Sequence, residues 1–215
     1  MRRLLTTCCL FLLVAVACNT SKTTATAEEG WISLFDGKSL AGWRASEHPA
    51  TFSVGDGMMV VDGPRAHLFY EGPVMDHDFK NFEFRAQVMT TPGSNSGIFF
   101  HTAYQEDGWP AQGYEVQVNN TQSDWRRTGS IYAYDEVREV HVADNEWFTQ
   151  TITVQGNTVT VRLNGKQVVA YTEPEGVERP ANEQGRRLSS GTFALQGHDP
   201  DSKVYYKDIM VRPLP

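Results

Sequence analysis

The chain has 215 residues, with 26 acidic and 19 basic side chains and a formal net charge of −7. This length favours a single domain with at most a short additional segment. An acidic surface without a large basic cluster argues against nucleic acid or anionic lipid as the main partner.

The N-terminus has the features of a bacterial export signal. Arg2 and Arg3 provide a positive start, and Leu10–Ala17 is an apolar run too short to cross a bilayer. Ala15-Val16-Ala17 before Cys18 resembles a lipobox, which predicts a signal peptide over 1–17, lipidation of Cys18 and a flexible tether over 18–29. The same three residues also fit ordinary signal-peptidase cleavage. The expected location is the periplasm, the outer membrane or the cell surface, with membrane contact through the lipid alone.

Cysteine usage follows from this reading. Cys8 and Cys9 would leave with the signal peptide, and Cys18 would be the first mature residue. The folded domain, expected over 30–215, would then contain no disulfide, no thiol nucleophile and no thiolate metal site.

From Gly30 onward the apolar residues recur with a period of two. Phe82, Phe84, Ala86 and Val88 alternate with polar residues, and Asn164-Gly165 is a strong hairpin signal. Other alternating runs lie near 98–101, 114–119, 149–154, 158–163, 167–171, 193–198 and 204–211. No stretch has a helical period with caps. The pattern predicts an all-β sandwich of two antiparallel sheets.

Two long polar segments interrupt the strands. Thr121–Asn145 contains scattered aromatic residues, and Glu173–Leu188 is rich in Pro, Gly and charge. Long loops on a sandwich often form binding sites, although solvated connectors are an equal alternative.

Alternation also sorts the polar residues by face. Where Tyr114 and Val116 face the core, Glu115 and Gln117 face away from it. The outer face of one bent sheet would form a concave groove, and the polar set expected there is Glu115, Gln117, His101, Gln196 and His198, with Arg85 and Gln87 as an extension.

Seven motifs in order resemble the 3-keto-disaccharide hydrolase domain family. They include Gly30–Leu40, Gly93–Phe100 and Gly113–Val118, and they continue through Thr128–Tyr132, Leu163–Lys166, Leu195–His198 and Lys207–Ile209. The resemblance spans Gly30–Leu214. It implies a concanavalin/LamG-like jelly-roll and an exported hydrolase acting on glycosides already oxidised at C3. Gly72 and Lys207-Asp208-Ile209 depart from the family pattern, which leaves the substrate's identity open.

The implied chemistry needs few groups. A C3 carbonyl acidifies the C2 hydrogen, a base removes it, the enolate expels the glycosidic oxygen, and water then adds. Glu115 is the expected base, and His198 or His101 the expected acid or carbonyl polariser. Lys207 could stabilise the enolate, but its strand parity points toward the core unless a bulge intervenes. The residues expected to bind substrate are Asn95, Gln117, Gln196, Arg85, Tyr132, Trp109, Trp125 and Lys207.

Other site types have weaker support. The strand at 115–119 carries one carboxylate, which argues against a two-carboxylate glycosidase. No cofactor is predicted, although loop acids suited to Ca²⁺ or another divalent cation occur at Asp76, Asp78, Asp107, Asp199 and Asp201. The alternatives are a non-catalytic sugar-binding module and a structural surface domain. The oligomeric state is left open.

Replacing Cys18 tests the anchor. Cys18→Ala removes the thiol that would carry the lipid, so we expect the protein to leave the membrane fraction for the soluble one. Fractionation followed by immunoblotting measures this. An unchanged distribution would rule out the lipid anchor.

Overall fold

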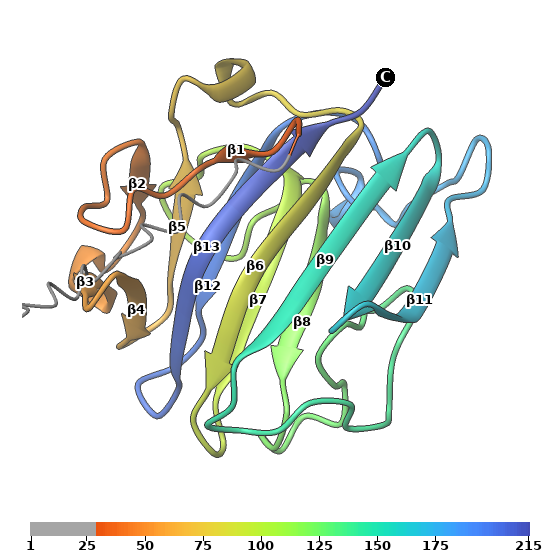
Figure 1. Ribbon diagram of the computed structural model, residues 1–215. Helices are drawn as coiled ribbons and strands as arrows, with labels where there is room; N and C mark the ends of the chain where they lie inside the picture. Colours follow the sequence, from red (N-terminus) through yellow and green to blue (C-terminus); the bar gives the residue numbers. More distant parts are fainter. Residues whose placement is uncertain (1–28) are drawn as a thin grey trace, which may run out of the picture.

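The structure, a computed structural model, describes residues 29–215 as two antiparallel β-sheets packed face to face (Figure 1). The larger sheet has the order β11-β10-β9-β6-β13-β4-β3, with β1 paired to β13. Its strands are β1 (Ile32–Ser33), β3 (Phe52–Gly55), β4 (Met58–Asp62), β6 (Phe82–Thr90), β9 (Phe148–Gln155), β10 (Thr158–Leu163), β11 (Lys166–Thr172) and β13 (Lys203–Pro213). The predicted β-sandwich is confirmed.

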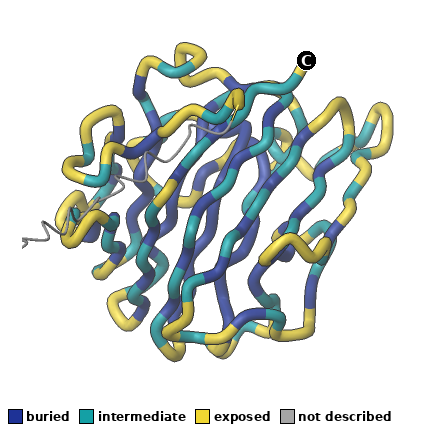
Figure 2. Tube along the Cα trace, in the orientation of Figure 1, coloured by how far each residue is buried: buried dark blue, intermediate teal, exposed yellow. Residues whose placement is uncertain are grey.

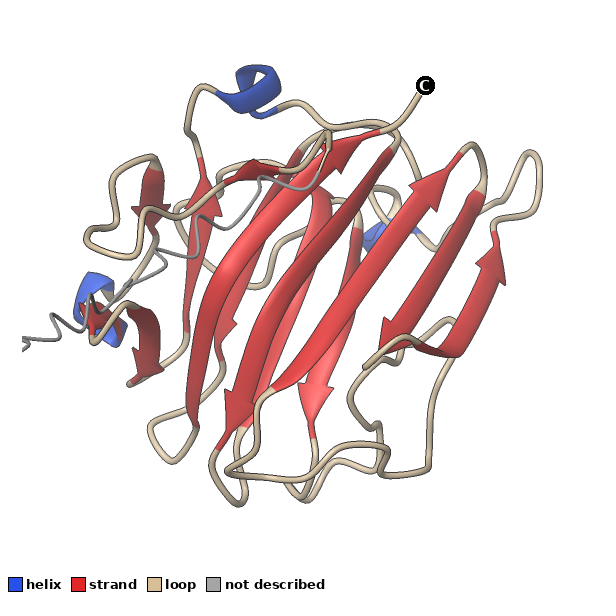
Figure 3. Ribbon diagram, in the orientation of Figure 1, coloured by secondary structure: helices blue, strands red, loops and turns tan. Residues whose placement is uncertain are grey.

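The smaller sheet has the order β2-β5-β12-β7-β8. Its strands are β2 (Trp43–Ala45), β5 (Ala66–Tyr70), β7 (Asn95–Thr102), β8 (Tyr114–Asn119) and β12 (Thr192–Gly197). The only helical segments in the described chain are three short 3-10 turns, η1 (Pro49–Thr51), η2 (Val74–His77) and η3 (Ala181–Glu183) (Figure 3). Among residues 29–215, no helix is long and apolar enough to span a membrane.

Apolar side chains from both sheets meet in one core. In β6, buried residues alternate with partly exposed ones, which is the period-two pattern read from the sequence. Phe193 of β12 links the sheets, because its ring lies 4.7 Å from that of Phe84 and 4.9 Å from that of Phe82. Buried aromatic pairs of this kind add to the stabilisation from burial.

The two sheets differ on their outer faces. Every residue of β5, β7 and β12 is buried, so the small sheet is covered on both sides (Figure 2). On its outer face Phe69, Phe99 and Ala194 form a second small apolar cluster, against which Tyr104 packs. Loops therefore cover the sheet face on which the sequence places the polar groove.

A bulge in β7 moves His101 away from that groove, contrary to the predicted placement. β12 pairs Thr192 with Thr102 and Ala194 with Phe99, so β7 has one extra residue, and His101 has a φ of 54°. The His101 ring is buried, with Nε2 bonded to the Lys80 carbonyl at 2.9 Å and Nδ1 accepting from the Ser189 amide at 3.1 Å. Both ring nitrogens already have backbone partners.

A second bulge, in β13, decides the position of Lys207. The register shifts between Lys207 and Met210, with Asp208 at a φ of 49°. Lys207 pairs with Gln87 of β6, and its Nζ lies 4.0 Å from the centre of the Trp147 ring. The bulge thus exists but leaves Lys207 on the large sheet, outside the groove. Arg85 lies on the same sheet, 4.1 Å from the Trp31 ring, and was also wrongly placed.

The predicted signal peptide, Cys18 and the tether up to residue 28 lie outside the described residues.

Candidate active site

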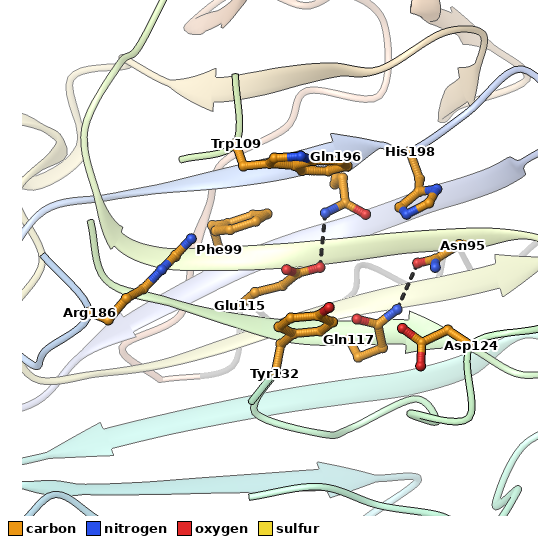
Figure 4. A pocket seen from close by; sticks show the side chains of 10 residues that line it. All are labelled: Asn95, Phe99, Trp109, Glu115, Gln117, Asp124, Tyr132, Arg186, Gln196 and His198. Atoms are coloured by element: carbon orange, nitrogen blue, oxygen red, sulfur yellow. Dashed lines mark hydrogen bonds between the residues drawn. The ribbon is translucent and has the colours of Figure 1, made fainter. Parts of the chain in front are cut away.

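A cavity of about 270 Å³ lies on the outer face of the small sheet (Figure 4). Strands supply its floor and loops supply its walls. The floor residues are Asn95 and Phe99 of β7, Glu115 and Gln117 of β8, and Gln196 at the end of β12. The wall residues are Trp109, Asp124, Tyr132, Arg186 and His198.

Glu115 lies across a gap that Gly97 leaves in the floor. β7 runs between β8 and β12, so a side chain at 97 would separate Glu115 from Gln196. A Cβ on Gly97 would lie 2.2 Å from the Glu115 Oε1 atom. Because that Cβ is absent, Gln196 Nε2 donates a hydrogen bond to Glu115 Oε1 at 2.9 Å (Figure 4). Gly97 is therefore needed for the carboxylate's position rather than for a turn.

The environment of Glu115 makes it a proton acceptor near neutral pH. Burial raises its pKa to about 7, because the charged form loses hydration. The hydrogen bond from Gln196 and the charge of Arg186 oppose this rise, and the charge of Asp124 adds to it. A cavity carboxyl with a pKa near the working pH is a strong candidate for a general base.

Two buried amides extend the polar floor. Gln117 Nε2 donates to Asn95 Oδ1 at 2.7 Å, and the backbone N–H of Asn95 donates to Ser202 Oγ at 2.9 Å. The side-chain carbonyls of Gln117 and Gln196 are buried and accept no hydrogen bond from the described protein residues. Buried acceptors are costly without a donor, so these two match a ligand rich in hydroxyl groups.

His198 is oriented by the residue that follows it. Its Nδ1 atom lies 2.6 Å from Asp199 Oδ2, which also accepts from Ser202 Oγ at 3.0 Å. Burial alone would raise the pKa of Asp199, but bonds from His198, Ser202 and the Asp201 amide outweigh it and hold that pKa below its ordinary value. The ionised Asp199 fixes the imidazole and leaves Nε2 for a ligand in the cavity.

Trp109 covers one side of the cavity. Its ring centre lies 5.5 Å from that of His198 and 5.5 Å from that of His67. Burial lowers the pKa of His67 to about 4, so the indole packs on a neutral imidazole. Trp109 is still 42% exposed, which leaves indole surface for stacking on a sugar ring.

The opposite wall is held by pairing along the edge of β8. The Gly129 amide donates to the Gln117 carbonyl at 3.0 Å, and the Tyr132 amide donates to the Glu115 carbonyl at 3.0 Å. These bonds fix Tyr132 beside the carboxylate. Trp125 of the same loop lies between Arg126 and Arg138 and does not line this cavity.

Most of the residues expected from the sequence meet here. The cavity lining includes Glu115, His198, Asn95, Gln117, Gln196, Tyr132 and Trp109, whereas His101, Arg85, Lys207 and Trp125 lie elsewhere. Sequence reasoning missed Phe99, Asp124 and Arg186 as site residues. Phe99 has the parity of the groove face, and Arg186 lies in a long loop flagged for binding, so both had a signal. Asp124 had none.

Among residues 29–215, no group of three or more His, Cys, Asp or Glu side chains is arranged to hold a metal ion. The five loop acids named from the sequence therefore form no such group either.

A family profile described as the 3-keto-alpha-glucoside-1,2-lyase-like domain matches residues 30–212. The chain belongs to this family. A curated relative, the 3-keto-disaccharide hydrolase of Bacteroides thetaiotaomicron, is 28% identical over 170 residues, which cover 66% of this chain and 59% of the relative. The matched region thus spans less than two thirds of that relative's length.

Solved structures of other proteins share the fold of this chain. A protein described as a glycosyl hydrolase from Parabacteroides distasonis aligns with a TM-score of 0.72 and 24% identity, covering 87% of this chain and 95% of the other. The carbohydrate-binding module CBM66 from Bacillus subtilis aligns with a TM-score of 0.54 and 10% identity, covering 80% and 95%. At these identities the matches to solved structures establish the fold alone.

The gap at Gly97 generates a testable prediction. Gly97→Ala should displace the Glu115 carboxylate toward water without unfolding the strand, because the three nearest atoms that the new Cβ would meet all belong to the Glu115 side chain and none to the backbone. NMR titration of the Glu115 carboxyl should give a pKa of about 7 in the parent and a value nearer 4.5 in the variant. Gly55→Ala, which adds a Cβ into open space, is the control. Equal pKa values in all three proteins would contradict the role assigned to Gly97.

The raised pKa also predicts a pH-dependent stability. The folded protein holds the Glu115 proton more tightly than the unfolded chain, so this stabilisation is full below about pH 4.5 and is lost as the pH rises to about 7. Relative to Glu115→Gln, the parent should lose up to roughly 3 kcal/mol of unfolding free energy over that interval. Urea denaturation at pH 4.5 and pH 8 measures it. If the difference in unfolding free energy between the parent and Glu115→Gln is the same at both pH values, the raised pKa of Glu115 is refuted.

Proposed function

We propose that the chain cleaves glycosides that carry a carbonyl at C3, with Glu115 removing the C2 proton. The observation that carries the proposal is the Glu115 carboxyl itself, buried in a cavity, aligned by Gln196 and raised in pKa to about 7. The family description names a 1,2-lyase, which agrees with bond formation between C1 and C2, and the curated relative is named a hydrolase.

The proposed steps balance without an oxidant or reductant. Glu115 takes the C2 proton, and the C–H electron pair forms the enolate of the C3 ketone. When the carbonyl re-forms, that pair becomes the C1–C2 double bond and the C1–oxygen bond breaks. The leaving oxygen takes up a proton. Water then adds at C1 and a proton returns to C2, so the net reaction is hydrolysis.

His198 and Arg186 are the groups proposed to handle charge. Asp199 holds His198 at Nδ1 and leaves Nε2 facing the cavity. When both ring nitrogens carry a proton, the Nε2–H group donates to the carbonyl or to the leaving oxygen. Arg186 lines the same cavity and is always protonated, so it replaces Lys207 as the cation that stabilises the enolate. Arg186 is a donor before the reaction begins, and His198 is a donor when its ring is doubly protonated.

A conventional two-carboxylate glycosidase is the competing mechanism. Asp124 is the second carboxylate in the cavity lining. Its Oδ1 atom accepts from the Arg126 amide at 3.0 Å, and Arg126 Nη1 lies 3.4 Å away. This pairing occupies Asp124, which favours elimination over direct displacement.

A non-catalytic sugar-binding module is the second candidate. The likeness to CBM66 and the exposed Trp109 favour it. Against it stands Glu115, because recognition of hydroxyl groups does not need a buried carboxyl with a raised pKa. Export and a lipid anchor at Cys18 remain part of the proposal.

The test compares 3-keto-disaccharides with their unoxidised forms. Glu115→Gln should lower kcat on the 3-keto form by roughly 10²–10⁴-fold, the usual contribution of a general base, while Asp124→Asn keeps most of it. In D₂O the parent's product should carry deuterium at C2. Assays with and without chelator report any metal requirement. Comparable turnover of unoxidised sugars, or near-normal turnover by Glu115→Gln, would overturn the proposal.

A further inference from the structure

A second cavity of about 250 Å³ adjoins the first and is lined by three of the same residues, Glu115, Tyr132 and Arg186. Sites for small molecules usually enclose about 300–1,000 Å³, a range that neither cavity reaches alone and that the two together do. In Figure 4, Arg186 lies on one side of Glu115, and His198 and Asn95 lie on the other. The proposed base therefore stands between two compartments.

The geometry of elimination explains such an arrangement. The carbon that loses its proton, C2, is bonded to C1, from which the leaving group departs. A base at C2 must then have the oxidised ring on one side and the leaving group close by on the other. On the basis of the proposed function, we propose that the second cavity binds the leaving part of the substrate.

The lining indicates which leaving groups would bind. Beyond the shared residues it is formed by Tyr114, Ala133, Tyr134, Asn182 and Glu183. Phenol rings stack on sugar rings or aromatic rings, and an amide with a carboxylate binds neutral groups rich in hydroxyls. The leaving group is therefore a second sugar or a hydroxylated aromatic alcohol, rather than a small alkyl alcohol.

The segment 173–188 carries much of this lining, and its contacts hold it in place. Arg179 Nε donates to the Arg186 carbonyl at 2.6 Å, and Arg179 Nη2 lies 3.4 Å from Glu173 Oε2. The Leu188 amide donates to Glu173 at 3.1 Å, and Glu173 also accepts from the Tyr114 hydroxyl. The cavity wall is thus formed before any ligand binds, which reduces the entropy lost on binding.

Two further contacts join this segment to the sheet and to the opposite loop. The Gly113 amide donates to the Gly185 carbonyl at 2.9 Å, and a Cβ on Gly185 would lie 2.4 Å from the Ala111 carbonyl oxygen. On the other side the Tyr134 hydroxyl donates to Glu183 Oε2 at 3.0 Å. Asn182 and Glu183 are held beside the tyrosines, so they are the residues to change.

The test uses one ratio: kcat/KM for a 3-keto-disaccharide divided by that for the methyl 3-keto-glucoside, whose leaving group is too small to fill the second cavity. Asn182→Ala removes a hydrogen-bonding group, and Glu183→Gln weakens a charge-assisted hydrogen bond to a neutral one. Each should lower this ratio roughly tenfold. Glu178→Gln, an exposed residue of the same segment with the same charge change, is the matched control and should leave the ratio unchanged.

The outcomes separate this inference from the function on which it rests. Turnover of neither substrate by the parent overturns the proposed function and the subsite together. Turnover of both, with an unchanged ratio in the Asn182 and Glu183 variants, overturns the subsite alone. Glu183→Gln is nearly isosteric, so it keeps the test decisive even where Asn182→Ala fails to fold.

Discussion

The site depends on one constraint, the burial of a carboxylate on the outer face of a β-sheet. A charge there would ordinarily point into water, where it keeps a low pKa and has little use as a base. Glu115 instead lies flat across Gly97 and accepts a hydrogen bond from Gln196 two strands away. The missing side chain in the middle strand makes that contact possible, and the surrounding loops keep water from restoring the ordinary pKa.

The loops keep water from the carboxylate because hydrogen bonds and an ion pair hold each loop against the sheet that it covers. The segment bearing Tyr132 pairs with the edge of β8, and the segment bearing Arg186 is held through Arg179 and Glu173. A sandwich with the same sheets and shorter connections would present an open face, suited to binding but not to proton transfer. The fold is thus shared with binding modules, and the covered face favours catalysis in this chain.

The alternation of residues along the strands could be read from the sequence, and with it much of the floor. Glu115, Gln117 and Gln196 were placed together because side chains two apart share a face. The placement of His101 failed because a bulge inserts one residue and reverses parity, whereas that of Lys207 failed because its strand belongs to the other sheet. Both strands contain a bulge with a non-glycine residue at positive φ, which leaves no motif in the sequence. Resemblance to the family pointed to the substrate class but not to the positions of these side chains.

The sequence by itself determined the fold class, the family and the residue expected to act as base. Only the tertiary structure decided which groups surround that base. Asp124 and Arg186 lie in long connections with no period, and they reach the cavity because hydrogen bonds between distant segments fix those connections on the sheet. The local sequence pattern determines on which face of the sheet a strand residue lies. The path of a loop depends instead on contacts that form only once the sheets have packed.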